Sequence, residues 1–188
     1  MGFSISWIGF RGESKDETLE ALGLVETPKI DEANESPISA AMIPTGWYIV
    51  FLNKFDHPFT TADSLKKLSA ASMAISCEIE EHIMFSSACL YRQGQKIWSA
   101  VHDFQSTGVY GLATSGTFDT EFEKIKAAQE AKQDAAGGTK SEVDYIFDIP
   151  LDAAESLCGY RHDRWKFSWG TPKFYEVAPK KKTTFWRR

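Results

Sequence analysis

The sequence that decides the fold is residues 75–104, ISCEIEEHIMFSSACLYRQGQKIWSAVHDF. Apolar and polar residues alternate at its start, as they do on a half-buried strand. Two further apolar segments, 83–91 and 97–104, flank the dipeptide Gln93-Gly94, which is typical of a tight hairpin turn. The stretch therefore predicts a three-stranded antiparallel meander.

The register of the second hairpin depends on the length of its turn. With a two-residue turn at Gln93-Gly94, Cys89 faces Trp98 and Phe85 faces His102. A change of one residue in the turn reverses the faces on which these side chains lie.

Outward from the meander, the chain adds further strands and helices. Residues 3–7 alternate like a strand, the apolar run 46–52 is typical of a strand buried on both faces, and 109–114 adds an edge strand. Helical spacing of Phe residues predicts a long helix at 118–135, and shorter helices are expected at 14–22, 61–72 and 148–158. We expect an α+β fold, with one long and two or three short helices on an antiparallel sheet of five to six strands.

Local signals fix some of the boundaries. Ser14 and Glu17 have the spacing of a capping box, and Gly23 can end the helix that they start. Residues 25–45 are rich in Glu, Asp, Pro and Ser with little periodicity, so we expect a long surface connection there.

Charge divides the chain into two parts. Residues 1–164 hold fourteen Lys/Arg and twenty-five Asp/Glu, a net charge of −11, whereas residues 165–188 hold seven Lys/Arg and one Glu, a net charge of +6. We expect a single acidic domain at 1–164 and a basic aromatic extension at 165–188. Trp165, Phe167 and Trp169 alternate, and Phe174, Tyr175 and Val177 are strongly apolar. This pattern predicts that the first half of the extension packs on the domain as a strand or clamp.

Several classes of site have no signature. The three cysteines lack metal or redox spacing, and none of the four histidines has a second His at ligand spacing, so we expect no metal and no cofactor. The phosphate-binding motifs are absent. The apolar N-terminal stretch ends at Arg11 with no basic residue before it, and no apolar run has the length of a membrane span. We therefore expect a cytoplasmic protein.

The leading functional hypothesis is a non-enzymatic protein-binding protein of the inhibitor or immunity type. Acidic, aromatic-bearing surfaces neutralise basic partners such as nucleases. The candidate contacts are Glu78, Glu80 and Glu81 at the end of one strand, with Tyr91 and Trp98 nearby. The partner is expected to be another protein, and the sequence does not indicate an oligomeric state.

A second hypothesis is a small-ligand-binding protein or hydrolase-like enzyme that uses the face of the meander. Its site would contain Cys89, Tyr91 and His102. Cys89 and His102 lie on neighbouring strands and could share a face, but an offset of about four residues at ~3.3 Å each is too long for direct contact. No catalytic residue is assigned, and an enzymatic activity is not favoured.

A third hypothesis assigns binding to the basic end of the chain. Basic residues interleaved with aromatic ones can contact single-stranded nucleic acid or an anionic membrane surface. Nucleic acid is disfavoured because the acidic body would repel it. The candidate contacts are Lys180, Lys181, Lys182, Trp186, Arg187 and Arg188.

Three stretches resemble a family of uncharacterised bacterial cytoplasmic proteins of about this length. They are residues 1–12 (MGFSISWIGFRG), 80–103 (EEHIMFSSACLYRQGQKIWSAVHD) and 143–163 (VDYIFDIPLDAAESLCGYRHD). The resemblance spans most of residues 1–163 and leaves the extension outside. It implies a single cytoplasmic domain and carries no assigned activity and no catalytic residues.

Overall fold

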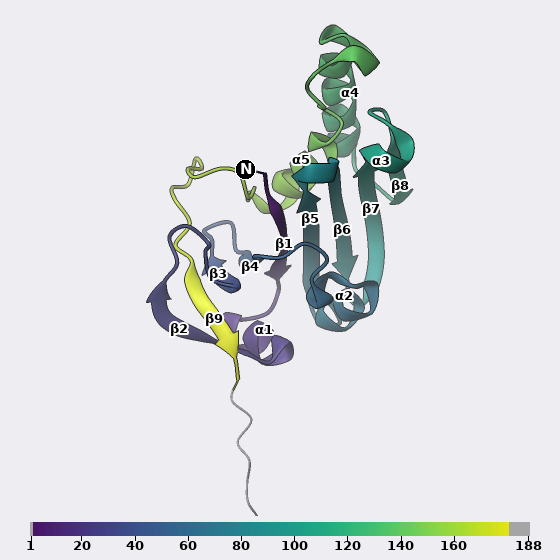
Figure 1. The fold of residues 1–188 in the computed structure, drawn as a ribbon. Coiled ribbons are helices and arrows are strands. Elements are labelled where there is room, and N and C mark those ends of the chain that lie inside the picture. The colour runs from purple at the N-terminus through teal and green to yellow at the C-terminus, as the bar shows by residue number, and fades with distance from the viewer. Residues whose placement is uncertain (1, 181–188) are drawn as a thin grey trace, which may run out of the picture.

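The computed structural model describes residues 2–180 and shows an α+β fold built on one antiparallel sheet (Figure 1). Within these residues the sheet has nine strands in the order β2-β9-β3-β4-β1-β5-β6-β7-β8. The strands are β1 (Ser4–Arg11), β2 (Leu24–Ile30), β3 (Ile38–Met42), β4 (Tyr48–Leu52), β5 (Met73–Glu80), β6 (Phe85–Arg92), β7 (Gln95–Asp103), β8 (Leu112–Gly116) and β9 (Tyr175–Pro179).

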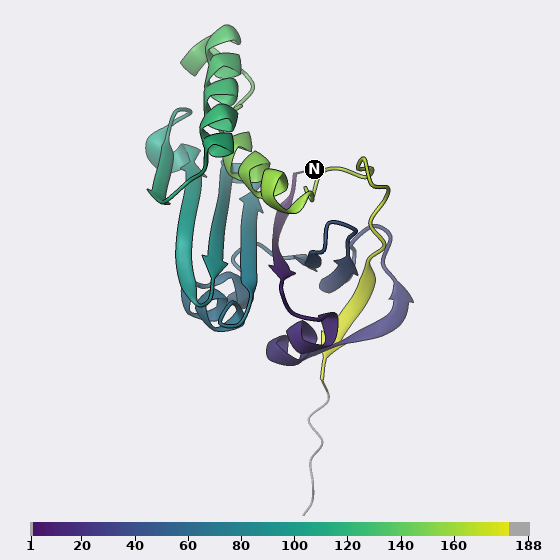
Figure 2. The ribbon, with the colours of Figure 1, turned by 180° about the vertical axis from the view of Figure 1, so that it is seen from behind.

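Helices cover both faces of the sheet. The α-helices are α1 (Lys15–Leu22), α2 (Ala62–Leu68), α3 (Phe104–Thr107), α4 (Thr120–Ala135) and α5 (Asp148–Cys158), and three short 3-10 turns are η1 (Pro58–Thr60), η2 (Glu81–Ile83) and η3 (Gly138–Lys140). Side chains of α4 and α5 pack into the core on one face, and side chains of α1 and α2 pack into the core on the other. Figure 2 shows α5 running toward the N-terminus, while α4 extends beyond the same end of the sheet.

Successive side chains of the central strands point to opposite faces of the sheet and so enter two separate hydrophobic cores. Trp7 and Phe51 point into the core under α5, whereas Ile8 and Val50 point into the core under α1 and α2. Every residue of β4 is buried, as the continuous apolar run predicts. The order of the sheet explains this burial, because β4 lies between β3 and β1.

The expected strand number was wrong: the sheet has nine strands rather than five or six. Two of the additional strands, β2 and β3, lie in the region 25–45, which we expected to be a surface connection. The third, β9, is formed by the C-terminal extension and is inserted between β2 and β3. β3 and β9 have five residues each and β2 contains Pro28, so the local pattern is weak, and long-range pairing decides their structure.

The register expected for the second hairpin was also wrong. Leu90, not Cys89, pairs with Trp98, and Ser86, not Phe85, pairs with His102. A bulge at Leu90/Tyr91 shifts the pairing by one residue and so reverses the expected faces. The turn itself lies at Gln93-Gly94 as predicted, and both residues have positive φ, which is typical of a type I′ turn.

The predicted start and end of the first helix are confirmed. The side chain of Ser14 accepts a hydrogen bond from the Glu17 amide, and Glu17 accepts one from the Ser14 amide. Gly23 ends the helix in the left-handed region. Among residues 2–180 there is no helix with the length and apolar character that a bilayer crossing requires. The cytoplasmic location stays a prediction.

Candidate functional site

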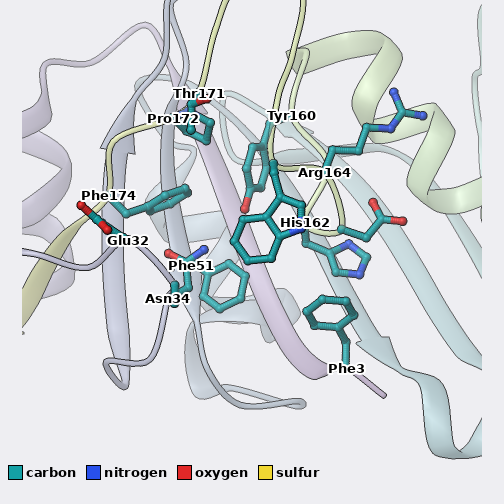
Figure 3. A pocket seen from close by; sticks show the side chains of 13 residues that line it. Phe3, Glu32, Asn34, Phe51, Tyr160, His162, Arg164, Thr171, Pro172 and Phe174 are labelled. Atoms are coloured by element: carbon teal, nitrogen blue, oxygen red, sulfur yellow. The ribbon is translucent and has the colours of Figure 1, made fainter. Parts of the chain in front are cut away.

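A small pocket lies where the start of β1 meets three loops, and it is the candidate functional site (Figure 3). Its volume is about 90 Å³. The loops contribute residues 32–34, 160–165 and 171–174, and Phe3 and Phe51 complete the wall. We call it the aromatic pocket because Phe3, Phe51, Tyr160, Trp165 and Phe174 all line it.

The turn after α5 positions the loop 160–165. Gly159 has φ of +78°, and a Cβ at this position would lie 2.9 Å from Thr45 Cγ2, so glycine is required. The Thr45 hydroxyl donates to the carbonyl of Cys158 at 2.6 Å, and Trp169 Nε1 donates to the carbonyl of Gly159 at 3.1 Å. These contacts fix the point from which the loop begins.

Arg161 anchors the loop to α5. Its guanidinium binds the carboxylates of Asp148, Asp152 and Asp163, with distances of 2.5 Å to Asp148 Oδ1 and 2.8 Å to Asp163 Oδ1. Burial opposes the charge of Arg161, but Asp163 and Asp148 raise its pKa above the usual range. One guanidinium therefore faces three carboxylates, which leaves a surplus of negative charge beside the pocket.

His162 is buried without a hydrogen-bond partner. It is 9% exposed, and neither ring nitrogen contacts a donor or acceptor within residues 2–180. Its ring meets the ring of Phe3 edge to face, with 4.8 Å between centroids. Burial lowers the pKa of His162 to about 4, with Arg161 acting in the same direction and Asp163 against it. The ring is therefore neutral at pH 7 and presents one unsatisfied donor and one unsatisfied acceptor.

The aromatic wall combines buried and exposed rings. Tyr160 and Phe174 are almost fully buried, and their ring centroids lie 5.9 Å apart. Phe51 and Phe174 meet edge to face at 6.3 Å. In contrast, Trp165 is 73% exposed and Phe3 is 37% exposed. Large exposed aromatic side chains beside a pocket are typical of a binding surface.

The loop before β3 supplies the polar edge of the pocket. Asp31 shapes this loop, because its carboxylate accepts hydrogen bonds from the amides of Glu35 and Ser36. Glu32 and Asn34 then line the pocket (Figure 3). Glu32 is exposed and forms no ion pair or hydrogen bond through its side chain with any residue that the structure describes.

Two open hollows adjoin the pocket. One, of about 620 Å³, shares Glu32 and Ala33 with it, and the other, of about 490 Å³, shares Thr171, Pro172 and Phe174. A pocket of about 90 Å³ is far smaller than the ~300–1,000 Å³ that hold drug-sized ligands. The arrangement thus fits the end of one side chain, with space beside it for the rest of a larger partner.

The acidic residues that the sequence singled out lie at the edge of this region. Glu81 accepts a hydrogen bond from the Phe3 amide at 2.8 Å, so it adjoins the pocket. Glu80 binds Ser4 and His82, and Glu78 binds Thr60 at 2.8 Å, with its pKa raised by burial. Tyr91 and Trp98 are both buried, and they point into opposite cores. The structure therefore does not bring these two aromatic residues together with the carboxylates.

The residues of the enzyme hypothesis do not meet. Cys89 and Tyr91 lie on the face of the sheet under α1 and α2, whereas His102 points to the face under α4 and α5. The expectation that Cys89 and His102 could share a face is therefore wrong. Burial raises the pKa of the Cys89 thiol, which disfavours the reactive thiolate. His102 is fully buried, and its nitrogens contact Gly111 O at 2.7 Å and Asp144 Oδ2 at 2.8 Å.

The extension contributes four residues to the wall of the aromatic pocket: Trp165, Thr171, Pro172 and Phe174. Residues 165–169 are not a strand; Phe167 and Gly170 pair across a turn, and the rings of Phe167 and Trp169 stack at 4.6 Å. Lys180 donates from its backbone to Gly23 O and from its side chain to Glu20. The other predicted contacts of the basic end lie outside the described residues: Lys181, Lys182, Trp186, Arg187 and Arg188.

The sequence pattern does not assign His162, Trp165, Phe3 or Glu32 to a site. They come from three separate segments, and no motif links them. Their signal was indirect, because His162 and Trp165 fall in a short run rich in charged and aromatic residues.

Across residues 2–180 there is no group of three or more His, Cys, Asp or Glu residues that could hold a metal ion. No protein family, curated protein or solved structure matches this chain, so the aromatic pocket is interpreted from its own chemistry.

Proposed function

We propose that this chain is a non-enzymatic binding protein and that the aromatic pocket is the centre of its contact with a basic partner protein. The observation that carries the proposal is the unpartnered, buried imidazole of His162 within an aromatic wall. Buried polar groups in folded proteins are nearly always hydrogen-bonded, and an unsatisfied one costs about 1–3 kcal/mol. A partner group that binds His162 would remove this cost.

The size of the pocket supports a protein partner. Its volume accommodates the end of a side chain, and the adjoining hollows give room for the surface around that side chain. An exposed Trp at the rim is the type of residue that dominates binding energy at interfaces. These features favour an interface over a site for a whole metabolite.

Charge supports a basic partner. Residues 1–164 carry a net charge of −11, and Glu32 and Glu81 lie at or beside the pocket. A surface potential of this sign attracts basic proteins over long range and raises their association rate. This is the inhibitor or immunity type of interaction, with the contact moved from the face of the meander to the aromatic pocket.

Site-specific photo-crosslinking tests the proposal. In one full-length chain a photoreactive phenylalanine analogue replaces Trp165. In a control chain it replaces Val143, an apolar residue whose exposed fraction is 52%. We expect a crosslinked basic protein at position 165 and none at position 143. Equal crosslinking at both positions, or crosslinking at neither, contradicts the proposal.

Reconstitution with the purified partner then gives the affinity. We expect Trp165→Ala to weaken binding at least about 30-fold, equivalent to an interface hot spot of about 2 kcal/mol, whereas Val143→Ala changes binding little. A complex that is indifferent to Trp165→Ala would mean that the pocket is not the contact.

A further inference from the structure

We infer that the aromatic pocket binds the guanidinium group of an arginine side chain. This inference rests on the proposed function and names the group that the partner presents. It is carried by three features of the site: aromatic rings, hydrogen-bond acceptors without donors, and a local surplus of carboxylates.

The rings provide favourable contact with a cation. Phe3, Phe51, Tyr160, Trp165 and Phe174 line one small space. A cation near the face of an aromatic ring is attracted by the negative charge of that face, and Trp and Tyr are the strongest partners. A guanidinium is flat and weakly hydrated, so it stacks on such rings more readily than an ammonium does.

Three side chains that line the pocket offer acceptors with free capacity, whereas the second ring nitrogen of His162 is a donor that a guanidinium leaves unpaired. Neutral His162 offers one unpartnered ring nitrogen with a lone pair, and Glu32 offers an unpaired carboxylate among the described residues. Asp163 also lines the pocket, and the structure shows a hydrogen bond from Arg161 to its Oδ1 alone. A guanidinium brings five N–H donors in one plane, which can reach several acceptors at once.

The two arginines of this region are paired, whereas Lys166 and Lys173 form no ion pair with a described residue. Arg161 binds three carboxylates, and Arg164, which lines the pocket, binds Glu155. The three carboxylates around Arg161 exceed its single positive charge, and this surplus favours an incoming cation.

The acceptors distinguish arginine from other cations. A quaternary ammonium would satisfy the aromatic rings but has no N–H to donate to His162. The lysine ammonium has three donors but is compact and strongly hydrated, so it loses more water on entering the pocket. Arginine matches both the rings and the acceptors.

Entry requires a movement of the wall, because the nitrogens of His162 are shielded from water. Trp165 is 73% exposed and therefore has the least packing to lose among the wall residues. We expect its side chain to move when arginine binds.

A titration of the full-length chain with short peptides tests the inference. The probe is acetyl-Gly-Arg-Gly-amide, and the matched controls replace Arg with citrulline, which is neutral but of similar shape, or with Lys; tetramethylammonium is the third control. The readout is the NMR signals of the His162 ring and the Trp165 indole. We expect saturable shifts of both signals with the arginine peptide, with a dissociation constant on the order of 1 mM for so small a probe.

The three control ligands test whether the pocket requires a guanidinium group. We expect no saturable shift with the citrulline peptide and weaker binding, by about 3-fold or more, with the lysine peptide and tetramethylammonium. An arginine peptide that binds no better than citrulline or tetramethylammonium overturns the inference, as does the absence of a shift at His162.

Two exposed glutamates of one loop give a matched pair of variants. Glu32 lines the pocket, whereas Glu35 lines the neighbouring hollow and not the pocket. We expect Glu32→Gln to weaken binding of the arginine peptide about 3-fold or more and Glu35→Gln to leave its affinity unchanged. Both variants lose one negative charge, but only Glu32→Gln loses it at the pocket. If both variants weaken peptide binding equally, the attraction is a general effect of net charge, and the inference is overturned.

The proposed function and the arginine assignment fail separately. If the partner crosslinks at position 165 but the arginine peptide does not bind, the pocket takes a different group. If the peptide binds as expected but no partner depends on Trp165, the pocket binds arginine outside a protein interface.

Discussion

Two regions of this molecule bury a histidine beside a carboxylate, and they use it in opposite ways. His102 is fully buried between Gly111 O and Asp144, and both of its nitrogens have partners. His162 is 9% exposed, and neither nitrogen has a partner within residues 2–180. His102 stabilises the fold through both of its nitrogens, whereas we propose that His162 contacts a partner.

The His102 region connects three parts of the chain. His102 lies on β7, Gly111 precedes β8, and Asp144 accepts hydrogen bonds from the amides of Ile146 and Phe147 just before α5. His102 therefore connects β7 to the loop before β8 and to the turn before α5 through two buried hydrogen bonds.

The largest effect is expected at His102. His102→Ala removes two buried hydrogen bonds and leaves the carboxylate of Asp144 without its partner, so we expect a loss of about 3–5 kcal/mol in the free energy of unfolding. Urea denaturation measures this loss. The double variant with Asp144→Asn should lose clearly less than the sum of the two single variants, because the two side chains share one buried hydrogen bond. Additive losses would contradict this coupling.

An intermediate effect is expected from the titration of His162. Its pKa is about 6.5 in the unfolded chain and about 4 in the folded chain. Above pH 6.5 the ring is neutral in both states. Below pH 6.5 the unfolded chain takes up the proton first, so the free energy of unfolding falls until about pH 4, by up to about 3 kcal/mol.

His162→Phe isolates this titration from that of other groups. The variant keeps an aromatic ring and cannot be protonated, so between pH 6.5 and 4 it should lose less stability than the unmodified chain. At pH 7 it should be at least as stable, because two unsatisfied polar atoms are removed. Parallel unfolding curves of both proteins across this range would contradict the lowered pKa.

The smallest effect on stability is expected at Trp165. Its side chain is 73% exposed, so Trp165→Ala should change the free energy of unfolding by no more than about 0.5 kcal/mol, as measured in urea. The same variant is expected to have the largest effect on partner binding. A loss of stability similar to that of His102→Ala would assign Trp165 to the fold and remove the contrast between the two regions.

Part of the fold could be predicted from local patterns. The capping box at Ser14, the left-handed end at Gly23, the turn at Gln93-Gly94 and the buried strand β4 each depend on a few consecutive residues, and all are present. The number of strands could not be predicted in this way. The strand β9 pairs with β2 and β3, which lie more than 130 residues earlier in the sequence. No local pattern can indicate such a pairing.

The candidate site was harder to predict than the fold. The bulge at Leu90/Tyr91 moves Cys89 and His102 to opposite faces, and no feature of the residues themselves signals it. The carboxylates Glu80 and Glu81 were recognised as a possible contact surface, and the structure shows Glu81 beside Phe3 at the pocket. Whether these carboxylates contact a partner stays a prediction.

The sequence by itself determined the acidic charge of residues 1–164, the α+β class and the local starts and stops of several elements, because charge, periodicity and caps act over short distances. The tertiary structure alone decided which histidine has partners. His102 and His162 both have an aspartate next to them in sequence, but His102 binds the distant Asp144, and Asp163 binds Arg161. Hydrogen-bond partners depend on which segments meet in space, and the fold brings acceptors to His102 and aromatic rings to His162.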